Sequence, residues 1–91
     1  MPMQTLKLVT IIAEEILQER ICKKILALGA TGYTCVECQG DGARGVRDET
    51  VKGSNVKIEV VCTAAVAGEI MTYVEDKYFE NFAIIVWQKT I

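Results

Sequence analysis

Apolar and polar residues follow patterns along the chain that predict two halves, each with a strand, a helix and a second strand. The segment Thr5–Ala13 is rich in β-branched and aliphatic residues and is predicted to be a strand. Apolar residues then recur at helical spacing, and Glu14 and Glu15 suit the start of a helix because carboxylates favour its N-terminus. Gly29 is expected to end this helix before a second strand over Gly32–Gln39. The expected apolar face of the helix is Leu17, Ile21, Ile25 and Leu28, widened by Ile16.

The second half repeats this order. Asn55–Cys62 alternates apolar and polar residues, as a half-buried strand does. Thr63 is a suitable N-cap for a second helix, which Asn81 is expected to break before a final strand over Phe82–Trp87. The expected apolar stripe of this helix is Val66, Ile70, Val74 and Tyr78, with Met71 beside it.

The order of these elements predicts an α+β protein with the ferredoxin-like βαββαβ fold, in which two helices cover one face of an antiparallel four-stranded sheet. The whole chain, residues 1–91, is expected to form a single domain. The strands are apolar on both faces, although the helices can cover only one. We therefore expect the open face to be buried against other copies of the chain.

A long polar segment, residues 40–54, separates the second and third predicted strands and is not explained by the fold. Hairpin loops usually have about 2–5 residues, and longer ones are often functional. Gly40 and Gly42 let the backbone approach a ligand closely, and Arg44 and Arg47 carry forked donors that suit phosphate oxygens. We therefore predict an anion site here, with a solvated hairpin tip as the alternative. The segment also matches GxGxxG, but no helical pattern follows, so it is not a Rossmann fingerprint.

Two of the four cysteines, Cys35 and Cys38, form a CxxC pair of the kind found in redox and metal sites. Residues three apart on a strand point to opposite faces, however, and the chain contains no histidine. We therefore interpret Cys22, Cys35, Cys38 and Cys62 as free buried thiols and expect no metal site. A copper-binding tolerance protein, a class with the same ferredoxin-like fold, is kept as an alternative.

Charge and hydropathy argue against several functional classes. A net charge of −2 disfavours nucleic-acid binding, which usually needs a concentrated basic face. No apolar run is long enough to cross a bilayer, and without a charged-then-apolar leader the protein is expected to be cytoplasmic. The absence of histidine leaves no clear acid–base set, so no enzyme is expected. Glu59, in an apolar strand, is interpreted as an acceptor for a ligand's amino group or as solvent-facing, rather than as a general base.

Four stretches spread over nearly the whole chain resemble a known family. They are KLVTII at Lys7–Ile12, GYTCVECQGDGARG at Gly32–Gly45, VKIEVV at Val56–Val61 and KYF at Lys77–Phe79. The combination is similar to the P-II nitrogen-regulatory proteins. It is still more similar to a P-II-like branch that comprises carboxysome-associated P-II proteins and regulators of the sodium-dependent bicarbonate transporter. The resemblance implies a homotrimer with a nucleotide in each cleft between neighbours, and it makes residues 40–54 the T-loop, which reports the ligand to a partner.

The resemblance also implies which residues contact the nucleotide. Ile12 and Thr34 would flank the adenine from one subunit, while Glu59 and Val61 would meet its edge from the neighbouring subunit. The glycines and arginines at the start of the T-loop would contact the phosphates. Lys89 is the one late basic candidate for the same role.

Two departures from the nitrogen-regulatory branch affect the expected ligand. The T-loop contains no tyrosine, so uridylylation is not expected. Asp76–Phe82 contains no glycine, whereas that branch holds a triphosphate with a glycine-rich segment there, so ADP, AMP or cyclic AMP is expected over ATP. The implied function is control of inorganic-carbon uptake or fixation, with bicarbonate as a further ligand and a bicarbonate transporter or carboxysome component as target. Regulation of nitrogen metabolism is the alternative within the family.

Overall fold

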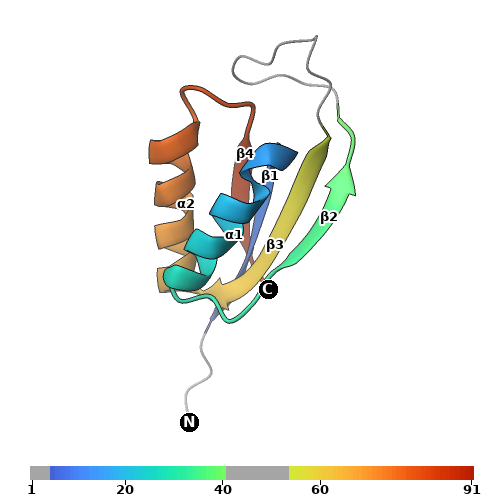
Figure 1. Ribbon diagram of the computed structural model, residues 1–91. Coiled ribbons are helices and arrows are strands. Elements are labelled where there is room, and N and C mark those ends of the chain that lie inside the picture. Colours follow the sequence, from blue (N-terminus) through green and yellow to red (C-terminus); the bar gives the residue numbers. More distant parts are fainter. Residues whose placement is uncertain (1–4, 41–53) are drawn as a thin grey trace.

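Two helices pack on one face of a four-stranded antiparallel sheet in the computed structural model, which describes residues 5–40 and 54–91 (Figure 1). The elements are β1 (Leu6–Glu14), a 3-10 helix (Glu15–Leu17), α1 (Gln18–Ala27), β2 (Thr34–Cys38), β3 (Asn55–Thr63), α2 (Ala64–Tyr78) and β4 (Ile85–Thr90). Their order along the sheet is β2-β3-β1-β4. The predicted ferredoxin-like fold, with both helices on one face, is therefore confirmed.

The core lies between the sheet and the two helices. The centre of the sheet is set by the register of β1 and β3, in which Val9 faces Val60 and Ile11 faces Ile58, and all four side chains are fully buried. The other side of the core comes from the helical segments, and most residues of the two predicted faces are in it: Leu17 of the 3-10 helix, Ile21 and Ile25 of α1, and Ile70, Val74 and Tyr78 of α2. Ala67 is also buried, whereas Leu28 and Val66 of the predicted faces are partly buried against the core. None of the helices in the described part is both long and apolar enough to cross a bilayer.

One residue assigned to the first helical face lies outside the core. Ile16 is 81% exposed because it belongs to the 3-10 helix that precedes α1. A 3-10 helix has about three residues per turn, so Ile16 is rotated away from its buried neighbour Leu17 instead of continuing the stripe of α1.

The last strand also begins later than predicted, at Ile85 instead of Phe82. The backbone N–H groups of Asn81 and Phe82 both donate to the Tyr78 carbonyl oxygen, at 3.2 and 3.0 Å, which closes a turn on the end of α2. Ile84 is buried but precedes the strand. The apolar run therefore covers a turn and a core residue as well as part of a strand.

The ends of the helices follow the predicted signals. The Thr63 hydroxyl accepts a hydrogen bond from the Val66 N–H at 3.3 Å, which makes Thr63 the N-cap of α2. Gly29 follows α1 with a φ of 114°, in the left-handed region that favours glycine. Hydrogen bonds from the N–H groups of Gly29 and Ala30 to the carbonyls of Leu26 and Ile25 complete a Schellman motif.

Candidate functional site

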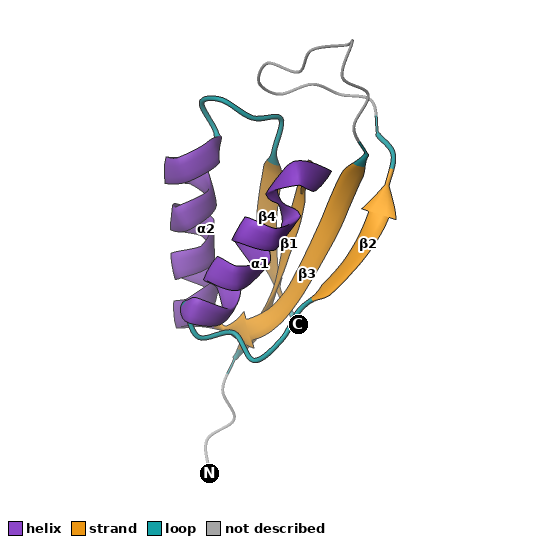
Figure 2. Ribbon diagram, in the orientation of Figure 1, coloured by secondary structure: helices purple, strands orange, loops and turns teal. Residues whose placement is uncertain are grey.

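The face of the sheet opposite the helices is left uncovered within one chain (Figure 2). Side chains alternate between the two faces of a strand, so the register of the pairs shows which residues share this open face. It carries every described residue of the predicted nucleotide site that lies in a strand: Ile12, Thr34, Glu59, Val61 and Lys89. The fold therefore brings these five residues, which come from four strands, onto one surface.

Glu59 lies in a row of residues that crosses all four strands. It faces Thr34 on β2 and Thr10 on β1, and Thr10 in turn faces Trp87 on β4. Thr10 is only 3% exposed although it lies on the open face, whereas Trp87 is 42% exposed. The row thus combines a carboxylate, a hydroxyl and an accessible aromatic ring, which are groups suited to hydrogen bonding and stacking with a planar ligand.

The other predicted contacts lie in the two rows that flank Glu59. The row on one side is Val36, Lys57, Ile12 and Ile85, and the row on the other side is Val61, Leu8 and Lys89. Adjacent rows on one face are two residues apart, or about 7 Å, so the rows of Ile12 and Val61 are separated by about 13 Å along the strands. Within one chain, a purine ring cannot contact both of these residues.

The charges on this face are few and partly exposed. The Lys57 ammonium lies 4.0 Å from a Glu59 carboxylate oxygen, and each side chain remains more than a third exposed. Exposed pairs of this kind contribute only about 0–1 kcal/mol, so a ligand group can displace the lysine at little cost. The Glu59 carboxylate is therefore accessible as a hydrogen-bond acceptor.

Apolar side chains cover much of the rest of the open face. Leu6, Val36, Val61, Ile85 and Trp87 are each 42–50% exposed. Such a group of large apolar residues on one side of a small protein is typical of a surface that contacts another protein chain. This agrees with the expectation from sequence that the strands are apolar on both faces.

The predicted phosphate contacts are only partly within the described residues. Gly40 is exposed just beyond the end of β2, and a Cβ atom added there would meet nothing within 4 Å. The fold of one chain therefore does not itself require glycine at this position. Gly42, Arg44 and Arg47 lie outside the described residues.

The cysteines divide between the two faces of the sheet. Cys35 points toward α1, where its Sγ lies 3.5 Å from the Sγ of Cys22, while Cys38 lies on the open face, as the spacing predicted. Burial raises the pKa of the Cys22 thiol to about 12, and the neighbouring Cys35 adds to the shift. Cys22 and Cys62 are buried, but Cys35 and Cys38 are half-exposed, so the prediction of four buried thiols was wrong for these two. In residues 5–40 and 54–91, no group of three or more cysteine or carboxylate side chains could hold a metal ion.

Two members of the central row, Thr10 and Trp87, were not among the residues predicted to bind the nucleotide. The alternation of β1 already placed Thr10 on the same face as Ile12, so that signal was present. Trp87 joins the row only through the pairing of β4 with β1, a long-range contact that a single sequence does not specify.

Comparison with known proteins identifies the family. The family model described as nitrogen regulatory protein P-II matches residues 6–90. A PII-like signalling protein from Thermus thermophilus is 35% identical, with a TM-score of 0.82 over 100% of this chain and 91% of that one.

Two more distant structures share the fold. CPII from Thiomonas intermedia K12, bound to ADP and bicarbonate, is 19% identical, with a TM-score of 0.71 over 96% of this chain and 88% of its own. GlnK from B. subtilis in complex with ATP is 18% identical, also with a TM-score of 0.71, over 96% of this chain and 84% of its own. The family match and the Thermus similarity extend over essentially the whole fold, and the chain therefore belongs to the P-II family of nitrogen regulatory proteins.

Proposed function

We propose that this chain is a non-enzymatic, cytoplasmic regulator that binds an adenine nucleotide between the subunits of a homotrimer and controls inorganic-carbon uptake or fixation. The observation that most directly supports this is the open sheet face, which gathers Ile12, Thr34, Glu59, Val61 and Lys89 from four strands. Membership of the P-II family supports the regulatory class.

A site shared between subunits agrees with the spacing on this face. The rows that contain Ile12 and Val61 lie about 13 Å apart, which is too far for one adenine ring to contact both in the same chain. If Ile12 and Thr34 come from one subunit and Glu59 and Val61 from its neighbour, the ring can lie between them. The exposed apolar residues of the same face would then be buried in the trimer.

In this arrangement Glu59 recognises the base. Its carboxylate accepts a hydrogen bond from the amino group of adenine, and it exchanges the weak contact with Lys57 for this bond. The phosphates lie toward the T-loop that follows β2. There Gly40 and Gly42 let the backbone approach the phosphates, and Arg44 and Arg47 balance their charge. Lys89 lies in the row of Val61, away from the T-loop end of β3, so it would reach the phosphates, like Val61, from the neighbouring subunit.

The end of α2 supports ADP or AMP, or cyclic AMP, over ATP as the ligand. The backbone N–H groups of Asn81 and Phe82 are engaged with the Tyr78 carbonyl oxygen. They are therefore not available to hold a triphosphate, and no glycine lies between Asp76 and Phe82.

Bicarbonate is a candidate second ligand, and the proposed target is a bicarbonate transporter or a carboxysome component. CPII from Thiomonas intermedia K12, which shares the fold, was solved with ADP and bicarbonate. The same fold also occurs in GlnK with ATP at nearly equal identity, so the nucleotide preference is the property to measure.

Isothermal titration with AMP, ADP, cyclic AMP and ATP, each with and without bicarbonate, tests the proposal. We expect AMP or ADP to bind most tightly, at one site per subunit. Tightest binding of ATP, strengthened further by 2-oxoglutarate, would instead assign the chain to nitrogen regulation. Absence of binding by every adenine nucleotide would refute the nucleotide site itself.

A further inference from the structure

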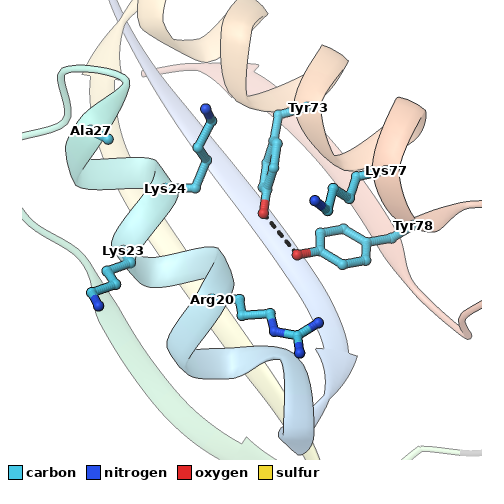
Figure 3. Close-up of a pocket in the computed structure, with 7 residues that line it drawn as sticks. All are labelled: Arg20, Lys23, Lys24, Ala27, Tyr73, Lys77 and Tyr78. Carbon is cyan, nitrogen blue, oxygen red and sulfur yellow. Dashed lines mark hydrogen bonds between the residues drawn. The ribbon is translucent and has the colours of Figure 1, made fainter.

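A groove between α1 and α2 lies on the other side of the molecule from the candidate nucleotide site (Figure 3). Its volume is about 440 Å³, and it is open to solvent. Four of the residues that line it are cationic, and two are tyrosines. The lining residues are Arg20, Lys23, Lys24 and Ala27 from α1 and Tyr73, Lys77 and Tyr78 from α2.

Three cations of α1 lie on one face of the helix. Arg20, Lys23 and Lys24 have the spacing i, i+3, i+4, and the uncharged Ala27 continues the same face at i+7 along the groove. Lys77 approaches the groove from α2 on the opposite side (Figure 3). This concentration of positive charge stands out because the whole chain has a net charge of −2.

These four cations form no ion pair within the described part of the chain, where the one ion pair joins Lys57 and Glu59 on the far side of the sheet. The Lys24 ammonium instead lies 5.7 Å from the centroid of the Tyr73 ring, in a cation–π contact. The positive groups of the groove thus keep their capacity to bind a negatively charged group from outside.

The two tyrosines add a neutral polar floor. Their hydroxyl oxygens lie 2.7 Å apart in a hydrogen bond, and their rings meet edge to face at a centroid distance of 5.6 Å. Tyr78 is almost completely buried, which fixes the position of the pair. One hydroxyl proton joins the two oxygens, and the other can be donated to an incoming carboxylate.

We propose that this groove binds an acidic segment of a partner protein. The charges come from both helices: three lie within about 6 Å along α1, and the fourth, Lys77, lies on α2 across the groove. Charges on two sides of an open groove suit several carboxylates in sequence better than a single compact phosphate. An extended segment of about three residues covers the length of the charged stretch on α1. The openness of the groove also suits a chain that lies across it. This inference goes beyond the nucleotide-binding function proposed above and does not depend on it.

The test is fluorescence anisotropy of a labelled peptide with four consecutive glutamates, titrated with the full-length protein at low and at physiological salt. We expect saturable binding that weakens as salt rises, because the contacts are between exposed charges. Lys23→Gln combined with Lys24→Gln should weaken binding by about tenfold. Tyr73→Phe, which keeps the ring and removes the hydroxyl, should weaken it by about threefold.

The matched control is Ala64→Glu combined with Ala65→Glu at the exposed start of α2, which changes the net charge by the same amount as the two lysine substitutions. It should leave peptide affinity close to that of the unmodified protein. An equal loss in this control would attribute binding to overall charge and overturn the proposal. Absence of saturable binding would also overturn the proposal. So would competition by inorganic pyrophosphate that displaces half of the labelled peptide at a concentration tenfold below the one at which unlabelled peptide does so, because the groove would then prefer a compact anion. Nucleotide titration of the same variants should give unchanged affinities, which separates the groove from the sheet-face site.

Discussion

Thr34 and Glu59 lie directly opposite each other on β2 and β3, on the face of the sheet that no helix covers. This pairing places a hydroxyl beside the one carboxylate of the central row. In the proposed function, this carboxylate distinguishes adenine from other bases, and the distinction can be measured.

We predict that Glu59→Ala weakens AMP binding by about 1.5–3 kcal/mol, the usual contribution of a hydrogen bond to a charged group. Inosine monophosphate carries a carbonyl where AMP carries its amino group. The unmodified protein should therefore prefer AMP, and the variant should bind both ligands with nearly equal affinity. Calorimetric titration of the four combinations gives the answer, and a variant that still prefers AMP would show that another group reads the base.

The assembly of the protein should depend on the open face. Val61→Asp combined with Ile85→Asp places charges among residues that are half-exposed in one chain and are proposed to be buried in the trimer. Burial of an unpaired charge is costly, so the variant should sediment as a smaller species than the unmodified protein. Ile16→Asp is a control that places one such charge away from the open face, because Ile16 is 81% exposed and belongs to the 3-10 helix. A variant that keeps the sedimentation coefficient of the unmodified protein would exclude this face as the interface.

Alkaline pH should destabilise the fold through Cys22. The folded state raises the pKa of its thiol from 9.0 to about 12, by burial and by the adjacent Cys35. A raised pKa means that this contribution to stability is complete below about pH 9 and is lost as the pH rises toward 12. Burial raises the pKa of Cys62 and Tyr73 in the same direction, so Cys22 accounts for part of the loss.

Urea unfolding at pH 7 and at pH 10.5 measures this effect. Cys22→Ala should lower stability at pH 7 through lost packing, but it should reduce the further loss between the two pH values. The further loss of unfolding free energy between pH 7 and pH 10.5 can differ between the two proteins by at most about 1.4 kcal/mol per pH unit above pH 9, which is the limit for one proton. If the variant loses as much stability over this range as the unmodified protein, Cys22 does not titrate as inferred.

Local patterns predicted the fold well because they depend on few residues. The N-cap at Thr63 and the stop at Gly29 were recognisable from residue type alone, and both are present. Ile16 was misplaced because helical spacing does not reveal that the first turn is a 3-10 helix. Phe82 was assigned to a strand because apolar composition cannot distinguish a turn closed on Tyr78 from a strand.

The candidate site was less predictable because it depends on contacts between distant parts of the chain. The pairing of Glu59 with Thr34, and of Thr10 with Trp87, follows from the register of three strand pairs. The groove has the same origin: the stripe from Arg20 to Ala27 can be recognised in the sequence, but its position opposite Lys77 follows from the packing of two helices.

Two glycines should respond to alanine in opposite directions. Gly29→Ala places a side chain at a φ of 114° and brings its Cβ to 3.3 Å from a methyl group of Val66. The left-handed conformation alone costs about 1–2 kcal/mol for an L-residue, so the variant should be less stable by at least that amount. Gly68 lies on the exposed side of α2, and a Cβ there meets nothing within 4 Å, so Gly68→Ala should stabilise the protein by about 0.8–1 kcal/mol through helix propensity. Urea unfolding of the two variants at pH 7 measures both changes. Each variant adds one methyl group, so the two differ mainly in backbone conformation. If Gly68→Ala also lowered stability, steric crowding at Gly68, in the monomer or in its assembly, would outweigh the gain in helix propensity.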